Sequence, residues 1–409
     1  MHDSGAKSSA TPMSHALSSQ NPSLSKTGKE LALYIHWPFC IAKCPYCDFN
    51  SHVRDQIDLE AWREALFLDL KHEHKVNPEP QISSVFFGGG TPSLMPPRLV
   101  ADLIAEADKL WGLIDGCEIT LEANPSSVEA SRFADLANAG VNRISLGLQS
   151  LDDQTLEFLG RAHDVQEGLA ALQIAQQSFE RVSFDLIYAR PGQSIAKWQS
   201  ELARALAFGT DHLSLYQLTI EPGTRFETLV RKGELIPADD DHAADLFELT
   251  QDLTAAAGLP AYETSNHAQS GQESRHNLAY WRYEDYAGIG PGAHGRRLKM
   301  ATERHKKPEN YLSAVQRNQH GLKIEQMLTP QTQATEALLM GLRLVEGIDL
   351  SNLAAKTGVP QDQLIDSHEL GSLASLGFVR QSGSQLSVLH KGMPLLDAIL
   401  PRLVSDTLA

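Results

Sequence analysis

The chain has 409 residues, of which 42% are hydrophobic and 21% are charged. This composition is typical of globular proteins, and the length is sufficient for two or three domains. The 35 basic and 51 acidic side chains give a formal net charge of -16, which repels polyanions and argues against nucleic acid as a partner. Because no apolar run approaches the roughly 18 residues that span a bilayer, we expect a cytoplasmic protein, with peripheral membrane contact left open.

The first thirty residues contain eight serines and two prolines and few large apolar side chains. Such a segment cannot bury enough surface to offset the entropy lost on ordering, so we predict a disordered tail over residues 1–30. The segment also lacks arginine and an amphipathic period, which argues against a mitochondrial presequence.

Three cysteines, Cys40, Cys44 and Cys47, lie close together in the sequence C-I-A-K-C-P-Y-C. Thiolates on one loop can hold three corners of a cubic [4Fe-4S] cluster and leave the fourth iron open for a ligand. Zinc sites usually add a second ligand pair at a distance, and no second cysteine pair exists here. A disulfide would leave one of the three unpaired. Cys117, the fourth cysteine, is predicted to be a small buried side chain.

From Leu31 onward, short apolar strands alternate with helical segments, which predicts a parallel sheet covered by helices. The predicted strands are 31–37, 83–88, 117–123, 141–148, 181–188 and 211–220. The predicted helices are 58–75, 96–111, 127–139, 152–178 and 194–207. Six strands are too few for a closed eight-stranded barrel.

Glycines and polar residues interrupt these apolar strands where the strands end. The second predicted strand ends in Gly88-Gly89-Gly90, whose missing side chains let the backbone approach a ligand closely. Glu122, Gln149 and Asp185 end or interrupt later strands. Ligand sites of such folds gather at the carboxyl ends of the strands. Because a buried carboxylate is costly unless it is paired, these residues predict a site for a cationic or hydroxyl-rich ligand.

The C-x3-C-x2-C loop resembles the signature of the radical S-adenosylmethionine (SAM) superfamily, in which Tyr46 occupies a commonly aromatic position. The resemblance implies a partial (β/α)6 barrel, a reducing compartment and a small electron-donor protein such as a flavodoxin or ferredoxin. In that family SAM chelates the open iron, and an electron from the cluster cleaves the sulfonium to give a 5′-deoxyadenosyl radical.

The span from Leu31 to about His320 is similar to the coproporphyrinogen III dehydrogenase branch of that superfamily. The resemblance implies that Tyr34 faces the cluster and the sulfonium, and that Gly89 and Gly90, supported by Thr91, hold the methionine amine. The same resemblance assigns other polar groups of SAM to Glu122, Gln149, Arg161 and Asp185, with Arg161 as a carboxylate clamp. The family usually reads G-L-P after the fifth strand, whereas this chain has Ala189-Arg190-Pro191-Gly192, so the shape of that loop is expected to differ.

Two features separate the branches of this family. The decarboxylating enzyme carries a fourth cysteine two positions after the third, where this chain has Phe49. The run H-N-L-A-Y-W, from His276 to Trp281, matches the H-N-x-x-Y-W motif of the HemW branch, whose members are regarded as haem chaperones.

The motif also suits a porphyrin chemically. His276 is predicted to supply an axial nitrogen to haem iron, while the rings of Tyr280 and Trp281 cover the macrocycle. Asn277 is expected to hold the imidazole tautomer. An alternative iron ligand is His294, in the close-packed loop G-I-G-P-G-A-H-G.

Residues 328–409 show helical stretches at 331–346, 350–357 and 361–376, followed by a hairpin-like segment, which resembles a winged helix. Five Lys/Arg against eight Asp/Glu in this segment leave no basic face for phosphate. We therefore interpret it as a cover for the barrel mouth or a partner-docking surface.

The predicted organisation is a tail (1–30), a partial barrel (31–265), a segment with the haem motif (266–327) and a smaller winged-helix-like domain (328–409). The favoured function is a haem chaperone that binds haem and a SAM-ligated [4Fe-4S] cluster and transfers haem to an unidentified acceptor protein. The alternative is an oxygen-independent coproporphyrinogen III oxidase, and a DNA-binding regulator is disfavoured by charge.

Overall fold

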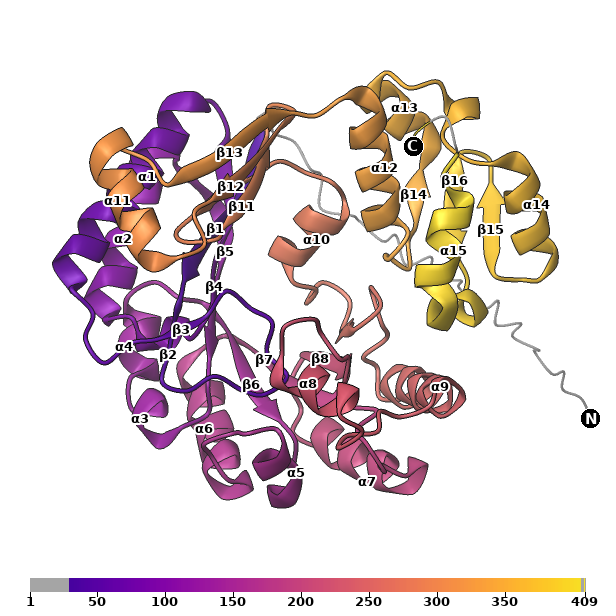
Figure 1. Ribbon diagram of the computed structural model, residues 1–409, viewed down its shortest axis with the longest axis horizontal. Coiled ribbons are helices and arrows are strands. Elements are labelled where there is room, and N and C mark those ends of the chain that lie inside the picture. Colours follow the sequence, from indigo (N-terminus) through magenta and orange to yellow (C-terminus); the bar gives the residue numbers. More distant parts are fainter. Residues whose placement is uncertain (1–28, 406–407, 409) are drawn as a thin grey trace, which may run out of the picture.

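A single open sheet of eleven strands organises the computed structural model, which describes residues 29–405 and 408 (Figure 1). Six neighbouring parallel strands form its centre in chain order. They are β1 (Glu30–Trp37), β4 (Gln81–Gly89), β5 (Leu113–Ala123), β6 (Arg143–Gln149), β7 (Arg181–Tyr188) and β8 (His212–Gln217). All six predicted strands, and the open barrel in place of a closed one, are thereby confirmed.

Segment 266–327 extends this sheet at both edges. On one edge β9 (Asn266–Ala268) runs antiparallel to β8. On the other, β10 (Tyr286–Ile289) runs parallel to β1. Three antiparallel strands continue outward from β10, namely β11 (His294–Arg297), β12 (Met300–Arg304) and β13 (Leu322–Met327). The segment that carries the haem motif therefore shares one sheet with the partial barrel.

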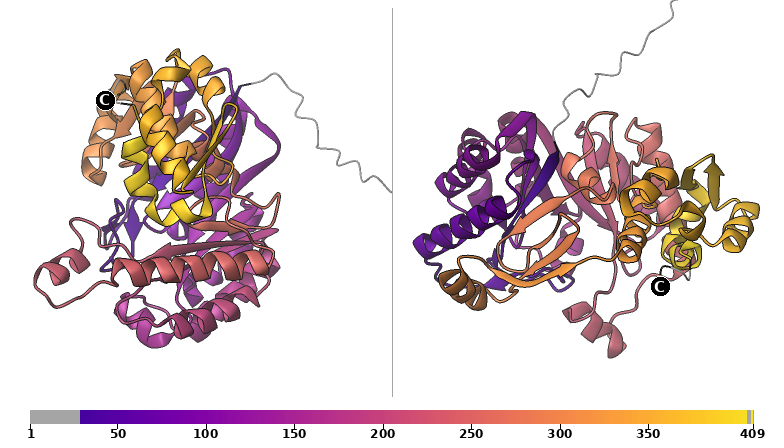
Figure 2. Two further views of the ribbon diagram at one scale, coloured as in Figure 1. Left: turned by 90° about the vertical axis from the view of Figure 1, so that its right-hand side faces the viewer. Right: turned by 90° about the horizontal axis from the view of Figure 1, so that it is seen from above.

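Helices cover the outer face of the parallel strands (Figure 2). They are α1 (Leu59–Val76), α2 (Pro97–Trp111), α3 (Ser127–Ala130), α4 (Phe133–Asn138), α5 (Asp153–Phe158), α6 (Val165–Ser178) and α7 (Ile195–Leu206). Two predicted helices, 127–139 and 152–178, are each divided. The second is interrupted at Gly160, where φ is +65° and a Cβ would lie 2.7 Å from Pro45 Cδ of the cysteine loop. This turn places Arg161 at the cysteines.

The remaining helices of the barrel lie outside the predicted set. They are α8 (Arg225–Arg231), α9 (Asp240–Ala256), α10 (Arg275–Trp281) and α11 (Pro308–Asn318). The H-N-L-A-Y-W motif forms most of α10. Ser274 caps this helix by accepting the N–H of Asn277.

The C-terminal segment has its own hydrophobic core, built from residues such as Leu338, Leu373 and Leu386. Its helices are α12 (Pro330–Gly341), α13 (Leu350–Thr357), α14 (Ser367–Ser375) and α15 (Leu396–Leu403). Its sheet has the order β14 (Ile348–Asp349), β16 (Gln385–Val388) and β15 (Val379–Ser382). The predicted smaller winged-helix-like domain is confirmed, although the predicted helix 361–376 contains only a 3-10 turn, Gln361–Gln363, followed by α14.

The two faces of the parallel sheet differ in chemistry, as β5 illustrates. Ile119 and Leu121 are buried in the core beneath the helices. The alternate residues Glu118, Thr120 and Glu122 point to the inner face. Polar side chains of the neighbouring strands join them there, since Arg143 Nη1 donates to Thr120 Oγ1 over 3.4 Å. The inner face is therefore the polar interior in which a site can form.

Cys117 is buried, as predicted, and burial raises the pKa of its thiol to about 12. Of the predicted tail, residues 1–28 lie outside the described residues, and Glu30 already begins β1. Among the helices of the described chain, none combines the length and the apolar character that crossing a bilayer requires.

Candidate functional site

The three clustered cysteines lie on the loop that follows β1. Two short parallel strands, β2 (Phe39–Cys40) and β3 (His52–Val53), close its base. All three thiols are half-buried and line a cavity of about 600 Å³, the first cavity. Burial raises the pKa of the Cys40 and Cys47 thiols, so metal binding would have to displace their protons. Across residues 29–405 and 408, no three His, Cys, Asp or Glu side chains converge on a single-ion position. Three thiols around a cavity suit a cluster better than a closed zinc site.

A chain of side-chain hydrogen bonds connects two of these cysteines across the strand ends. Thr91 Oγ1 donates to Cys40 Sγ over 3.4 Å and accepts from Asn124 Nδ2 over 3.1 Å. Arg161 donates from Nη2 to Asn124 Oδ1 over 2.5 Å and from Nη1 to Cys44 Sγ over 3.4 Å. Donors to both sulfurs favour the thiolate form that metal ligation needs. Asn124 was not among the predicted site residues, although it lies only two residues after Glu122.

Most donors of the Arg161 guanidinium are already engaged. Besides Cys44 and Asn124, Nη2 donates to the Gly147 carbonyl over 3.0 Å. Its Nε is buried without a partner among the described residues. Arg161 therefore retains one unpaired donor for a ligand, and its remaining donors hold the cysteine loop to the ends of β5 and β6.

Two carboxyl groups, Glu122 and Asp185, line the first cavity, and neither forms an ion pair with another of the described residues. Glu122 Oε2 accepts the Gly89 N–H over 3.2 Å. Burial, and secondarily Asp185, raise the pKa of Glu122 to about 8. Burial raises the pKa of Asp185 to about 6, although Ser145 donates to it over 3.3 Å. Such carboxyls would be stabilised in their charged form by a cationic ligand.

The glycine turn after β4 holds the cysteine loop as well as bordering the cavity. Gly90 N donates to Trp37 O over 2.7 Å, and Thr91 N donates to Phe39 O over 2.9 Å. A Cβ on Gly90 would lie 2.7 Å from Phe39 O. A larger residue at position 90 would therefore displace the cysteine loop, so its effect could not be assigned to a ligand alone.

The loops that follow β6 and β7 are held together by contacts outside the first cavity, although the last residue of β6 lines that cavity. Gln149 lines the first cavity in a left-handed conformation with φ of +67°. In the unusual Ala189-Arg190-Pro191-Gly192 turn, Arg190 Nη2 pairs with Glu201 Oε2 over 2.5 Å and Nη1 donates to Ser150 Oγ over 2.7 Å. This buried ion pair between the two loops and α7 gives a physical reason for the departure from G-L-P.

Tyr34 lines a neighbouring space of about 690 Å³, the second cavity. Gly89 and Glu122 border both cavities. The Tyr34 hydroxyl lies 3.0 Å from His36 Nδ1, and its ring stacks near Phe86 with centroids 6.2 Å apart. Tyr34 therefore lies in a cavity that adjoins the one lined by the thiols, and its orientation toward the cluster and the sulfonium stays a prediction.

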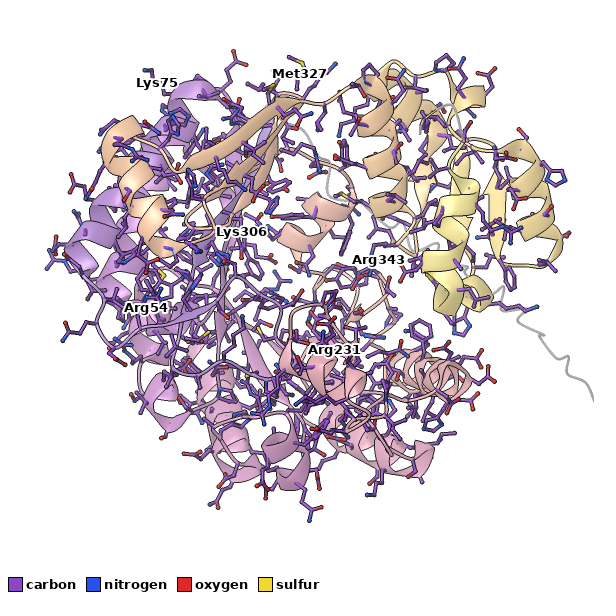
Figure 3. The ribbon with its side chains drawn as sticks, viewed as in Figure 1. Arg54, Lys75, Arg231, Lys306, Met327 and Arg343 are labelled. Atoms are coloured by element: carbon purple, nitrogen blue, oxygen red, sulfur yellow. The ribbon has the colours of Figure 1, made fainter. Side chains whose placement is uncertain are left out.

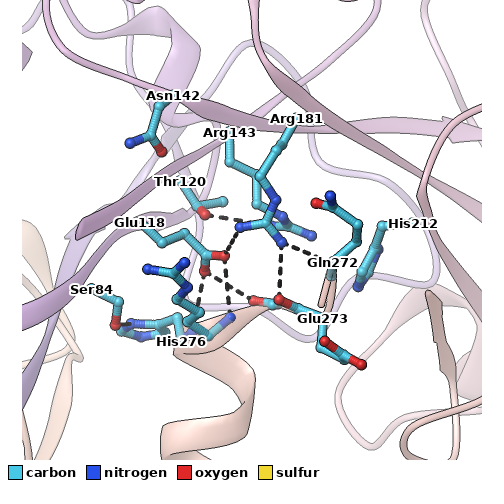
Figure 4. A network of polar contacts seen from close by, with 12 residues as sticks. Ser84, Glu118, Thr120, Asn142, Arg143, Arg181, His212, Gln272, Glu273 and His276 are labelled. Atoms are coloured by element: carbon cyan, nitrogen blue, oxygen red, sulfur yellow. Dashed lines mark hydrogen bonds and ion pairs between the residues drawn. The ribbon is translucent and has the colours of Figure 1, made fainter. Parts of the chain in front are cut away.

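His276 lies beside Ser84 at the opposite end of the barrel interior (Figure 4). Its ring stacks on that of Phe86, with centroids 5.0 Å apart, and lies 6.3 Å from that of Tyr34. Its Nδ1 is 2.9 Å from Ser84 Oγ, and its Nε2 is buried without a partner among the described residues. Burial lowers the pKa of the imidazole to about 4, so the ring stays neutral. Ser84 is therefore the partner that fixes this imidazole, whereas Asn277, predicted for that role, contacts Tyr262.

A buried ion pair anchors the start of α10 (Figure 4). Glu118 pairs with Arg181 over 2.5 Å and accepts the backbone N–H groups of Arg275 and His276, both over 3.2 Å. Arg181 also donates to the carbonyls of Gln272 and Glu273. Burial alone would raise the pKa of Glu118, but Arg143 and Arg181 hold it below its ordinary value. The motif helix is thereby fixed to the inner face of the sheet.

The aromatic residues of the motif point to different surroundings. Tyr280 packs on Tyr286 with ring centroids 4.2 Å apart and lines the second cavity. Trp281 lies beneath Arg343 of the segment after α12, with the guanidinium carbon 5.0 Å from the ring centroid. His294, the alternative ligand, is exposed and lines the second cavity. The structure therefore does not bring His276, Tyr280 and Trp281 around one cavity.

The chain matches the radical SAM superfamily over residues 34–204 and the HemN C-terminal domain over residues 328–395. It is 34% identical to "Heme chaperone HemW" of Escherichia coli K12, over 92% of this chain and 98% of that protein. It is 37% identical to "Radical S-adenosyl methionine domain-containing protein 1, mitochondrial" of Bos taurus, over 91% of this chain and 87% of that protein.

Among solved structures, the fold is similar to coproporphyrinogen III oxidase (HemN) from Escherichia coli. The TM-score is 0.77, with coverage of 91% of this chain and 90% of that one, at 21% sequence identity. At this identity the likeness shows a common fold.

Proposed function

The chain belongs to the radical SAM superfamily and, within it, to the family of the heme chaperone HemW, and we propose that it is a haem chaperone that transfers haem to an acceptor protein. Membership of the superfamily implies SAM and a [4Fe-4S] cluster. The observation that carries the proposal is the 34% identity to HemW over nearly its whole length. The geometry of the cysteine loop supports membership of the superfamily.

The residues around the first cavity fit the implied cofactors. Cys40, Cys44 and Cys47 would hold three irons of the cluster, and the cavity beside them would leave the fourth iron accessible to SAM. When bound, the cluster supplies the electron for reductive chemistry on SAM.

The protein's own groups would orient SAM at this cavity. Glu122 and the Gly89-Gly90 turn suit an ammonium group, since the carboxyl has no fixed cation. Asp185 and Gln149 suit ribose hydroxyls, and the free Nε of Arg161 suits a carboxylate. Thr91 and Asn124 would keep the cysteine loop in place.

Phe49 distinguishes a chaperone from a decarboxylating oxidase in this proposal. It stands where the oxidase branch has a fourth cysteine, and its side chain is 58% exposed beside both cavities. A phenyl ring supplies neither a thiol ligand nor a proton donor. It can instead offer an apolar surface to a flat ligand.

Anaerobic cluster reconstitution followed by parallel incubations tests the proposal. With haem, we expect a stoichiometric complex with a Soret band, and we expect loss of that band from this protein when a haem-free acceptor, such as an apo-cytochrome b-type protein, is added. With coproporphyrinogen III, SAM and reductant, we expect no protoporphyrinogen. Steady formation of protoporphyrinogen would establish the alternative oxidase, and failure to bind haem would reject the chaperone.

Haem, an acceptor protein and a small electron donor such as a flavodoxin or ferredoxin are the proposed partners. Cellular location stays a prediction, because the bovine relative is named as mitochondrial and the chain was expected to be cytoplasmic. Fractionation of cells that express the full chain would decide it.

A further inference from the structure

The second cavity has the size of a cofactor site and adjoins the site predicted for SAM, with which it shares Gly89 and Glu122. Its volume of about 690 Å³ falls within the roughly 300–1,000 Å³ typical of small-molecule sites. One wall is the cysteine loop from Asp48 to His52, and the opposite wall comes from the loops around β11 and β12. The cavity therefore opens between the cluster loop and the edge extension of the sheet.

Three imidazoles line this cavity, and one of them is free. The ring nitrogens of His36 are both engaged, with the Tyr34 hydroxyl at 3.0 Å and Asn50 O at 2.9 Å. His52 Nε2 lies 3.3 Å from Asn50 Oδ1. The ring of His294 makes no hydrogen bond to another residue within 29–405 or 408, and its side chain is exposed to the cavity. His294 is the imidazole that can bind a metal without breaking an existing contact.

The glycine-rich loop fixes the position of His294. A Cβ on Gly290 would lie 2.3 Å from His36 O, and one on Gly292 would lie 2.5 Å from Asn50 Nδ2. Asn50 Nδ2 donates to Pro291 O over 2.8 Å and to Lys306 O over 2.9 Å. These contacts tie the loop that carries His294 to the cysteine loop, so the imidazole is held beside residues 48–52 of that loop.

The other groups around the cavity match the needs of an iron porphyrin. Tyr34, Tyr280 and the exposed Phe49 offer aromatic surface to a macrocycle. Lys43 and Lys306 are exposed at the cavity and can pair with carboxylates. In the view of Figure 3, Lys306 lies between the β11–β13 extension and α10. One free imidazole, three aromatic rings and two ammonium groups thus surround a single space.

His276 presents the opposite case. It is 3% exposed, lines neither cavity, and belongs to a helix anchored by the Glu118–Arg181 ion pair. Its unpartnered Nε2 is buried away from both cavities, and moving α10 to expose it would break that pair and the bonds to two backbone N–H groups. The cost of exposing a buried ion pair partner is several kcal/mol.

We propose that haem binds in the second cavity, with His294 as its axial iron ligand and Lys43 and Lys306 paired with its two propionates. This inference rests on the proposed haem-chaperone function. It assigns His276 the role of a positioning residue that anchors α10, so that Tyr280 borders the cavity.

Haem titration of the cluster-loaded full-length protein tests this placement. We expect His294→Ala to change the Soret band and to lower haem affinity at least tenfold, whereas His368→Ala, which removes an exposed imidazole from the C-terminal domain, leaves both unchanged. Lys43→Gln combined with Lys306→Gln should weaken haem binding with an unchanged Soret maximum, and Lys75→Gln, on α1, should have no effect. Iron and sulfide content should be the same in the wild type and in these four variants.

His276→Phe serves as the discriminating variant, since it keeps an aromatic ring at that position. Under the proposal its haem complex retains the wild-type Soret maximum. If His276→Phe loses the Soret signature while His294→Ala keeps it, the placement is overturned but the chaperone function stands. If the wild-type protein binds no haem, both are rejected.

Discussion

Glu118 and Glu122 lie four residues apart on the inner face of β5, yet they are held in opposite ways. Glu118 is fully buried and paired with Arg181, and its pKa is lowered. Glu122 has no ion-pair partner among the described residues, and its pKa is raised to about 8. Side chains on a strand alternate between its two faces, so residues four apart point to the same face, and β5 supplies both groups. The comparison shows that a fixed cation, and not burial itself, distinguishes the two glutamates. We call the end of the barrel interior at Glu118 the closed end and the end at Glu122 the open end.

The same contrast extends to the histidines at the two ends. At the closed end, His276 is neutral, buried and fixed by Ser84 beneath the ring of Phe86. At the open end, His294 faces the second cavity without a hydrogen-bond partner among the described residues. We interpret the closed end as a packed region that stabilises the barrel and the open end as the place where ligands bind.

Removal of the cluster ligands, at the open end, should have the largest effect of the substitutions considered. Cys40→Ala, Cys44→Ala and Cys47→Ala should each abolish the roughly four irons and four sulfides per chain, because a cube held by two thiolates lacks an anchor. Iron and sulfide analysis after anaerobic reconstitution measures this. Cys117→Ala is the matched control and should keep full content. Loss of iron in the control would contradict the ligand assignment.

Stability should respond with opposite sign to substitution of the two glutamates. Glu118→Gln leaves Arg181 partly buried without its counter-ion, and we expect a loss of about 3 kcal/mol, at the lower end for buried pairs because Arg181 is 22% exposed. Glu122→Gln should raise the melting temperature of the ligand-free protein at pH 7. A carboxyl with a raised pKa stabilises the fold at low pH, and this contribution is lost as the pH rises toward about 8.

Calorimetry on both variants at pH 7 measures these changes. A matched fall in melting temperature for Glu118→Gln and Glu122→Gln would show that the two glutamates are equally structural, and the comparison between the two ends would fail.

Affinity for SAM should depend on the open end alone. Glu122→Gln removes a charge-assisted hydrogen bond worth roughly 1.5–3 kcal/mol, which corresponds to a tenfold or greater loss of affinity. Anaerobic calorimetry with cluster-loaded protein measures it. Glu118→Gln should bind SAM normally. Equal affinity of Glu122→Gln and the wild type would reject the amine site.

The pH dependence of SAM binding sharpens the same point with the smallest effect. Below about pH 8 the Glu122 carboxyl of the free protein carries a proton, which it must release to pair with an ammonium group. Affinity should therefore rise between pH 6.5 and pH 8, by at most about tenfold per pH unit. Glu122→Gln should flatten this slope. A wild-type affinity that is independent of pH would show that Glu122 does not meet a cation.

How far the sequence predicted the site depended on how local each signal was. The three cysteines lie within eight residues, so the set of cluster ligands could be predicted from their spacing alone. The six strands followed from apolar runs, and the polar residues at their ends followed from the rule that parallel strands present their carboxyl ends at one edge. Glu122, Gln149 and Asp185 therefore line the predicted cavity with the thiols.

Other contacts join residues far apart in the chain, and no local pattern reports them. Asn124 reaches Arg161 across two strands, and Asn50 reaches Lys306 across 256 residues. The extension of the sheet by β10 to β13 was missed because these strands are short and lack a long apolar run. Their placement depends on pairing with β1, which is a tertiary choice.

The sequence by itself determined the chemistry of this protein: three clustered thiols, glycines and carboxyls at strand ends, and an H-N-L-A-Y-W helix. Only the tertiary structure decided which of these groups remain available to a ligand. Glu118 and Glu122 have the same side chain and the same strand, and His276 and His294 have the same ring. Packing gave Glu118 a cation and buried His276, on α10, against the inner face of the sheet, while it left Glu122 and His294 facing cavities. Whether a side chain can bind a ligand depends on its surroundings, because a buried group that already has a fixed partner must lose that partner before it can bind another.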